Sequence, residues 1–241
     1  MKAALKRKKK SKGKPEKKLA VIIIIRWMGI VLLAAMLVSI VTVVAFRYIN
    51  PPVTPLIISR SIDGIKNRGK MTWVSYENIS QHMVNAVVAS EDNRFVEHRG
   101  FDFAEVRKAY EQHRKGRRLR GASTITQQTC KNVFLWDGRS YIRKGLEVWF
   151  TVWVELLWSK QRIMEVYLNV IEMGGGIYGI EVAAQAYYCK PASRLLPEEA
   201  AMIAAILPSP LKRDPMKPTA YMQKRQLQIL DLMNKIGMVK L

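Results

Sequence analysis

The chain has 241 residues, with 40 Lys and Arg against 19 Asp and Glu, and 49% of its residues are hydrophobic. This hydrophobic content excludes a disordered polycation, because disorder requires low hydrophobicity as well as high net charge. The two cysteines, Cys130 and Cys189, form no CxxC pair, which excludes a disulfide-rich scaffold and gives no zinc-binding pattern. We expect two free, buried thiols.

The N-terminal region combines a basic tail with a long apolar run. Residues 1–18 hold ten bases and one acid, which leaves a net charge of +12 downstream. From Leu19 to Phe46 the only charge is Arg26, and the last 20 residues are uncharged, enough for about 30 Å of helix. Their Ile, Val, Leu and Phe side chains together favour membrane insertion by about 3 to 7 kcal/mol. We therefore predict a basic cytoplasmic tail over 1–18 and a transmembrane helix over 19–46.

The sequence after this helix predicts one domain outside the cytoplasm. Ten bases precede the span and only Arg47 follows it closely, which places the N-terminus in the cytoplasm. The segment lacks a small-residue cleavage site, so we expect an uncleaved anchor. Pro51, Pro52 and Pro55 predict a stiff, extended stalk over 47–58. Residues 59–241 then have the size of a single domain.

Apolar residues recur at helical spacing through most of this domain, which predicts a mainly α fold. A helix should run towards Glu91, and Gly174 to Gly176 should end a helix that covers 163–173. Pro197 should start a helix that ends before Pro208. One short extended piece is expected over 56–62. The stripes expected to face the core are Ile79, Met83 and Val87; Leu146, Trp149, Trp153 and Leu156; and Ile229, Met233 and Ile236.

Residues 90–102, SEDNRFVEHRGFD, form the densest cluster of polar side chains. Glu91 would stand at the end of an apolar-striped helix, where partial burial suits a carboxylate to act as a general base. On sequence alone, a solvated helix end is the favoured interpretation of the same residues.

Residues 121–132, GASTITQQTCKN, predict a helix start. Thr124 and Gln127 have the spacing of a capping box, and the first amides of such a helix attract phosphate. Gln127, Gln128 and Lys131 would then share one face and suit a charged oxyanion. A plain surface helix is the competing interpretation.

Two further segments are strongly charged. In RKGLEVW, residues 143–149, Glu147 can pair with both Arg143 and Lys144 on the face opposite the Leu146 stripe, and its simplest interpretation is a surface ion pair. Residues 105–120 hold seven bases and two acids, which predicts a mobile basic loop for lipid headgroups, diphosphate or nucleic acid.

The segments EDNRFVEHRGFD, GASTITQQTCKN, RKGLE and KQRIMEVYLN occur in this order and resemble the four signature motifs of the peptidoglycan glycosyltransferases. That family comprises the N-terminal module of class A penicillin-binding proteins and free-standing monofunctional biosynthetic transglycosylases. The resemblance covers about residues 60–210. It implies a lysozyme-like, two-lobed, mainly α domain behind a single N-terminal transmembrane helix.

The resemblance also implies roles for individual residues. Glu91 matches the general base and Glu147 the second acidic residue, which could help to hold a divalent cation, Mg or Mn; no organic cofactor is implied. Residues of the fourth motif, Lys160, Glu165, Tyr167 and Asn169, have a more architectural role. The positions that match substrate-binding residues are Asp92, Ser123, Gln127, Gln128, Lys131, Arg139, Arg143 and Lys144.

The implied reaction is polymerisation of lipid II into β-1,4-linked glycan, with inversion at the donor carbon and release of undecaprenyl diphosphate. The partners would be lipid II, the lipid-linked glycan, the membrane and other cell-wall synthesis proteins. SPLK, residues 209–212, fits the Ser-x-x-Lys of penicillin-binding proteins, but only 29 residues follow it, so no transpeptidase domain is expected.

Two alternatives remain open at this point. A lytic transglycosylase or lysozyme-like hydrolase would share one acidic residue in a helical fold, but it would not need cations for a diphosphate. A membrane-anchored nucleic-acid-binding or scaffold protein would use the basic segments. It would leave Glu91 and Glu147 unexplained, and aromatic residues do not alternate with the basic run as base stacking requires, so we expect no nucleic-acid partner.

Overall fold

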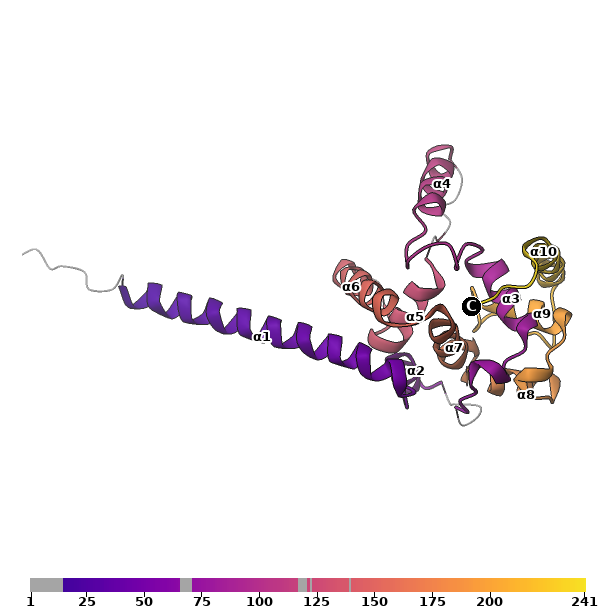
Figure 1. The fold of residues 1–241 in the computed structure, drawn as a ribbon, viewed down its shortest axis with the longest axis horizontal. Helices are drawn as coiled ribbons and strands as arrows, with labels where there is room; N and C mark the ends of the chain where they lie inside the picture. The colour runs from indigo at the N-terminus through magenta and orange to yellow at the C-terminus, as the bar shows by residue number, and fades with distance from the viewer. Residues whose placement is uncertain (1–14, 66–70, 117–120, 122, 139) are drawn as a thin grey trace, which may run out of the picture. The chain divides into compact units, whose positions relative to one another are not determined.

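A computed structural model describes residues 15–65, 71–116, 121, 123–138 and 140–241 (Figure 1). The chain divides into two compact units, residues 1–42 and 43–241. In the first unit the main element is α1, Pro15–Tyr48, whose last turns belong to the second unit. Its segment Leu19–Tyr48 is, among the described residues, the one helix long and apolar enough to cross a membrane. The predicted apolar helix is therefore confirmed, two residues longer at its C-terminal end.

The second unit is built from helices, as the periodicity predicted. Its elements in chain order are α2 (Pro55–Ile62), η1 (Tyr76–Asn78), α3 (Gln81–Glu91), α4 (Phe103–Arg114), α5 (Ile125–Phe134), α6 (Tyr141–Leu157), α7 (Lys160–Val170), β1 (Glu172–Gly174), β2 (Ile177–Tyr178), α8 (Ile180–Tyr188), η2 (Ala192–Arg194), α9 (Pro197–Ile206) and α10 (Ala220–Ile236).

The helices of this unit form two packed groups. In one group α3 and α10 pack on α9, whose run of buried small and apolar residues lets neighbouring helices approach closely. In the other, α6 and α7 pack on α5. Figure 1 shows α4 standing away from both groups, and Ala109 is its only buried residue. The end of α3 and the start of α5 meet where the two groups adjoin.

A two-stranded antiparallel hairpin, β1 with β2, follows α7, and the sequence did not predict it. The helix expected over 163–173 therefore ends at Val170. Gly179 comes directly after the hairpin with a φ of +82°, and a Cβ there would lie 2.6 Å from the carbonyl oxygen of Asn169. Only glycine fits this turn, because the backbone is left-handed and the space is closed.

Three predictions about local structure were wrong. Residues 56–62 are helical, because Thr54 caps α2 and Pro55 occupies the first helical turn, where a missing N–H is harmless. The predicted stalk therefore overlaps both α1 and α2. Residues 105–114, expected in a mobile loop, belong to α4, since Asp102 caps that helix and an Arg107–Glu111 ion pair spans one turn of it.

The third wrong prediction concerns the buried face of α6. Its buried residues are Glu147, Phe150, Thr151 and Val154. Of the expected stripe, Trp149 and Trp153 are half-buried and pack against the core, whereas Leu146 and Leu156 are exposed. The helix carries apolar side chains on more than one face, so periodicity did not identify the face that packs. The stripe on α10 was predicted correctly, with Ile229 and Met233 buried.

Candidate active site

A cleft lies at the junction of the two helix groups. It is bounded by the end of α3, the start of α4, the segment before α5 and one side of α10. Glu91, Asp92 and Ser123 all line it, so the structure brings three of the predicted site residues together. Its other charged lining residues are Asp102, Glu105, Lys108 and Arg225.

Glu91 is the last residue of α3 and is half-buried. Its Oε2 accepts a hydrogen bond from Nε2 of Gln128, at 3.0 Å. The apolar face of α3, with Met83 and Val87 fully buried, holds the helix against α9 and so fixes where Glu91 enters the cleft. A carboxylate that lines a cleft and is held by a neutral amide can accept a proton from a bound hydroxyl group.

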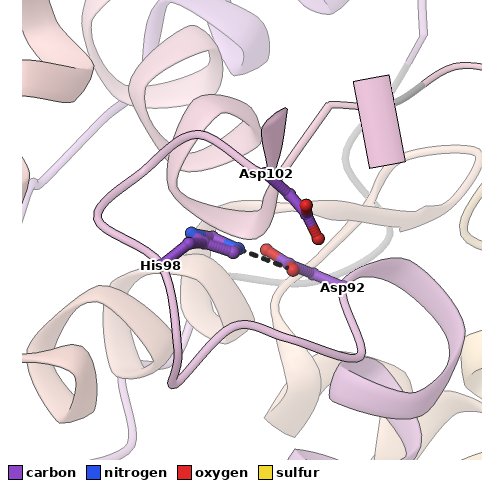
Figure 2. Close-up of side chains that lie close together, drawn as sticks. All are labelled: Asp92, His98 and Asp102. Carbon is purple, nitrogen blue, oxygen red and sulfur yellow. Dashed lines mark hydrogen bonds and ion pairs between the residues drawn. The ribbon is translucent and has the colours of Figure 1, made fainter. Parts of the chain in front are cut away.

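Asp92, the next residue, connects three segments of the chain. Its Oδ1 lies 2.8 Å from Nε2 of His98, and its Oδ2 accepts from the backbone N–H of Ile125 at 3.1 Å. Figure 2 shows that Asp92, His98 and Asp102 point towards one another. Asp92 therefore joins the end of α3 to the first residue of α5.

Asp92, His98 and Asp102 place one potential metal-ligand atom each within 4.8 Å of the others, the only such group in the described part of the chain. The group does not have the character of a cation site, because Oδ1 of Asp102 already accepts from Arg94, at 3.2 Å, and from the backbone of Glu105. A cation there would compete with that guanidinium for Oδ1 of Asp102.

The predicted capping box at the start of α5 is confirmed: Thr124 accepts from the amide of Gln127, and the Gln127 side chain accepts from the amide of Thr124. The prediction that the first amides of this helix are available to bind phosphate is wrong for two of them. The N–H of Ile125 is bound by Asp92, and that of Gln127 by Thr124. Gln127 is buried and acts as a cap, whereas Ser123 is exposed in the cleft.

Gln128 and Lys131 lie one turn apart on α5, on the same side of the helix. Gln128 contacts Glu91, so Lys131 extends from the same side of α5 as the amide that holds the carboxylate. Burial raises the pKa of Glu172, and the charges of Arg60 and Lys131 oppose that rise. The Lys131 ammonium thus lies within electrostatic reach of Glu172.

Glu147 is buried within α6, with 3% of its surface exposed, and it is not part of a surface ion pair. Its Oε2 accepts from Nη1 of Arg143 at 3.3 Å, and its Oε1 pairs with Lys144. The Arg143 side chain is 12% exposed and that of Lys144 47%, so only Lys144 reaches far into solvent. Arg139 lies outside the described residues.

The divalent cation expected at Glu147 is not favoured by this arrangement. Both carboxylate oxygens of Glu147 are engaged by cationic side chains, and no other acidic residue joins them in the described ion pairs. A metal there would have to displace Arg143 or Lys144.

Residues of the fourth motif hold the two helix groups in place. Lys160 donates to the carbonyl of His98 and pairs with Glu155, and Asn169 bonds both backbone groups of Val74. Tyr167 contacts Gln128 through its hydroxyl group. The architectural role that the resemblance implied for this motif agrees with these contacts.

Sequence reasoning missed two residues at the site. His98 stands in the first motif, six residues after Asp92, and its acid-rich surroundings were a usable signal. The side chain of Glu155 is buried, and it accepts hydrogen bonds from both Thr126 and Lys160. It stands alone within an apolar run, and only the fold reveals its partners.

The prediction of two free, buried thiols is right for Cys130 and wrong about the burial of Cys189. Both cysteines are free, and Cys130 is buried on α5, where burial raises its pKa. Cys189 is exposed, because it follows α8 in the left-handed conformation at a helix end.

Comparison with known proteins agrees with this geometry. The model of the transglycosylase family matches residues 59–234. A protein named biosynthetic peptidoglycan transglycosylase from Bacteroides thetaiotaomicron is 52% identical over 202 residues, which cover 82% of each chain. Proteins of the same name from Caulobacter vibrioides and Aeromonas hydrophila are 53% and 44% identical, over 79% and 89% of this chain and 82% and 92% of their own lengths.

The fold defines a mainly α domain with a cleft between two helix groups, and the comparisons show the family to which it belongs. This chain belongs to the transglycosylase family. The lysozyme-like fold that the motifs implied is thereby confirmed.

Proposed function

We propose that this protein polymerises lipid II into β-1,4-linked glycan strands, with inversion at the donor anomeric carbon and release of undecaprenyl diphosphate. The observation that carries the proposal is the family match over the whole domain, together with relatives whose names specify biosynthesis. These names do not favour a lytic hydrolase. The cationic side chains Lys131, Arg143 and Lys144 suit a diphosphate leaving group, which a hydrolase of finished glycan does not release.

In the proposed mechanism Glu91 accepts the proton of the acceptor 4-hydroxyl group as that oxygen attacks the donor C1. The bond from C1 to the diphosphate oxygen breaks with its electron pair, so the leaving group gains negative charge. General-base catalysis of this kind contributes about 10²- to 10⁴-fold to a rate. The position of Glu91 in the cleft and its neutral amide partner support the role.

The developing negative charge requires cations that are already in place. Lys131 and Arg143 are half-buried, so they would meet the diphosphate in a poorly hydrated environment, and Lys144 would add a more mobile charge. Glu147 carries the wrong sign to bind an anion. We propose that it holds the guanidinium of Arg143 and the ammonium of Lys144 in position.

We further propose that the catalytic domain lies outside the cytoplasm, at the membrane, and that it carries no transpeptidase activity. The basic tail ahead of the apolar helix supports this orientation. Tyr141, Ile142, Val152 and Leu156 of α6 expose their apolar side chains, and such a face suits contact with lipid around a substrate that remains in the membrane. Proteins of cell-wall synthesis would be its partners, and nucleic acid would not.

The test is to incubate the purified full-length protein with lipid II and, separately, with finished glycan. Glycan should form from lipid II, and finished glycan should stay intact. Glu91→Gln should lower polymerisation by about 10²- to 10⁴-fold, because it keeps the shape of the side chain and removes the base.

Circular dichroism should show an unchanged fold in that variant. Cleavage of finished glycan would instead support the lytic alternative, and more than about a tenth of wild-type turnover in Glu91→Gln would assign the base elsewhere.

A further inference from the structure

Three side chains from three helices form a chain of hydrogen bonds that ends at Glu91. The hydroxyl group of Tyr167, on α7, donates to Oε1 of Gln128, on α5, over 3.2 Å. Nε2 of Gln128 donates to Oε2 of Glu91, at the end of α3, over 3.0 Å. The chain thus crosses from one helix group to the other.

The amide of Gln128 has one orientation that satisfies both neighbours. Its NH₂ group faces a carboxylate, which only accepts, and its oxygen faces a phenol, which can donate. Turning the amide over would place Oε1 against the carboxylate, so two acceptors would face each other. The Tyr167 hydroxyl opposes that turn because it offers the oxygen a donor.

Tyr167 is suited to remain a donor throughout the working pH range. It is fully buried, and burial, with the negative charges of Glu91 and Asp92, raises its pKa well above the usual 10. Its side chain belongs to the main hydrophobic core, and α7 packs on α5, which restricts movement of the hydroxyl group away from the amide.

We propose that Tyr167 is a positioning residue for the base: through Gln128 it keeps Glu91 ionised and aimed into the cleft. The inference rests on the proposed function, because Glu91 must be the base for its ionisation to matter. It assigns Gln128 to the support of Glu91 and not to binding of the substrate, which was the role expected from its motif.

Other charged groups line the same cleft and influence Glu91 as well. They are Asp92, Asp102, Glu105, Lys108 and Arg225. Replacing Tyr167 by phenylalanine changes none of these charges. A change in the pH dependence of such a variant therefore reports the hydrogen-bond chain and not the general electrostatics of the cleft.

The experiment measures turnover of lipid II against pH in the full-length protein and in Tyr167→Phe. A hydrogen bond to a carboxylate favours its ionised form, so its loss should move the acidic limb of the profile to higher pH, by about one unit. Turnover on that acidic limb should fall about 10-fold, the loss that a one-unit shift of the limb produces there. Gln128→Met should do the same, and the double variant should lose no more than either single variant.

Tyr187→Phe is the matched control. The hydroxyl group of Tyr187, on α8, donates to the carbonyl group of Met173 in β1, outside the chain of hydrogen bonds that ends at Glu91. The substitution removes a buried tyrosine hydroxyl group and should leave the acidic limb where it is. The inference would be overturned if the acidic limb were unchanged in both Tyr167→Phe and Gln128→Met. The proposed function would still stand in that case, provided that the wild-type protein is active and Glu91→Gln is inactive. If Tyr167→Phe does not fold, the Gln128→Met profile decides. A wild-type protein that does not polymerise lipid II would instead refute the proposed function.

Discussion

Glu91 and Glu147 are two carboxylates of one domain that differ in exposure and in the partners found for them. Glu91 is half-buried at the cleft and accepts from a neutral amide. Glu147 is buried inside α6 and pairs with Arg143 and Lys144. A carboxylate that lines a cleft can accept a proton from a bound group, whereas one that balances two cations loses both pairings when it is protonated. From this difference we infer that Glu91 is suited to accept a proton and that Glu147 is suited to hold positively charged side chains in position.

The largest expected difference between substitutions at Glu147 and at Glu91 is in the free energy of unfolding. Glu147→Gln should lower the free energy of unfolding by about 3 to 5 kcal/mol, because it leaves the Arg143 guanidinium buried without its counter-charge. For a domain of this size, this corresponds to a melting temperature about 10 °C lower. Thermal melts followed by circular dichroism in detergent would measure it.

Glu91→Gln serves as the control for that experiment. The new amide oxygen can still accept from Gln128, so stability should change by no more than about 0.5 kcal/mol. If Glu147→Gln melted at the wild-type temperature, the Arg143–Glu147–Lys144 group would be only the surface ion pair that the sequence first suggested.

A second, smaller effect should appear in catalysis. Lys131→Ala should raise the activation free energy by about 2.7 to 4 kcal/mol, because charge grows on the leaving group near a cation that is already in place. Lys131→Arg should recover much of the turnover with lipid II. Lys235→Ala, at an exposed ion pair with Asp231, is the control and should leave turnover unchanged. Equal turnover in Lys131→Ala and the control would remove Lys131 from the leaving-group side.

The smallest expected effect is on the reaction of the two cysteines with a thiol reagent, which reports on the packing around Glu147. Cys130 packs where Glu147 and Thr151 influence it, and burial raises its pKa, so it should not react with a thiol reagent in the native protein. Cys189 is exposed and should react at once. Labelling should therefore count one thiol in the native protein and two in denaturant.

The same reagent can test the comparison. Glu147→Gln should increase the labelling rate of Cys130, because a weakened α6 opens more often, and Glu91→Gln should not. Two rapidly reacting thiols in the native wild-type protein would contradict the packing of α5 against α6.

Much of the fold could be predicted from local pattern. The helices that contain Met83 and Ile229 were expected because apolar residues recur at helical spacing, and the helix that contains Ile203 was expected from Pro197 and Pro208 at its ends. The capping box at Thr124 was predicted from two residues three apart. The faces of α6 could not be predicted, because apolar residues surround Glu147 on several sides and only packing on α5 decides which of them is buried.

By itself, the sequence determined the apolar span, the helical content and the family, because each depends on residues that are near one another in the chain or on motifs in a fixed order. The tertiary structure alone decided which polar groups became partners. Gln128 meets Glu91, 37 residues earlier, and Tyr167, 39 residues later, only because α3, α5 and α7 pack together. Hydrogen bonds act over about 3 Å, so spacing along the chain does not predict them when the groups lie on different helices.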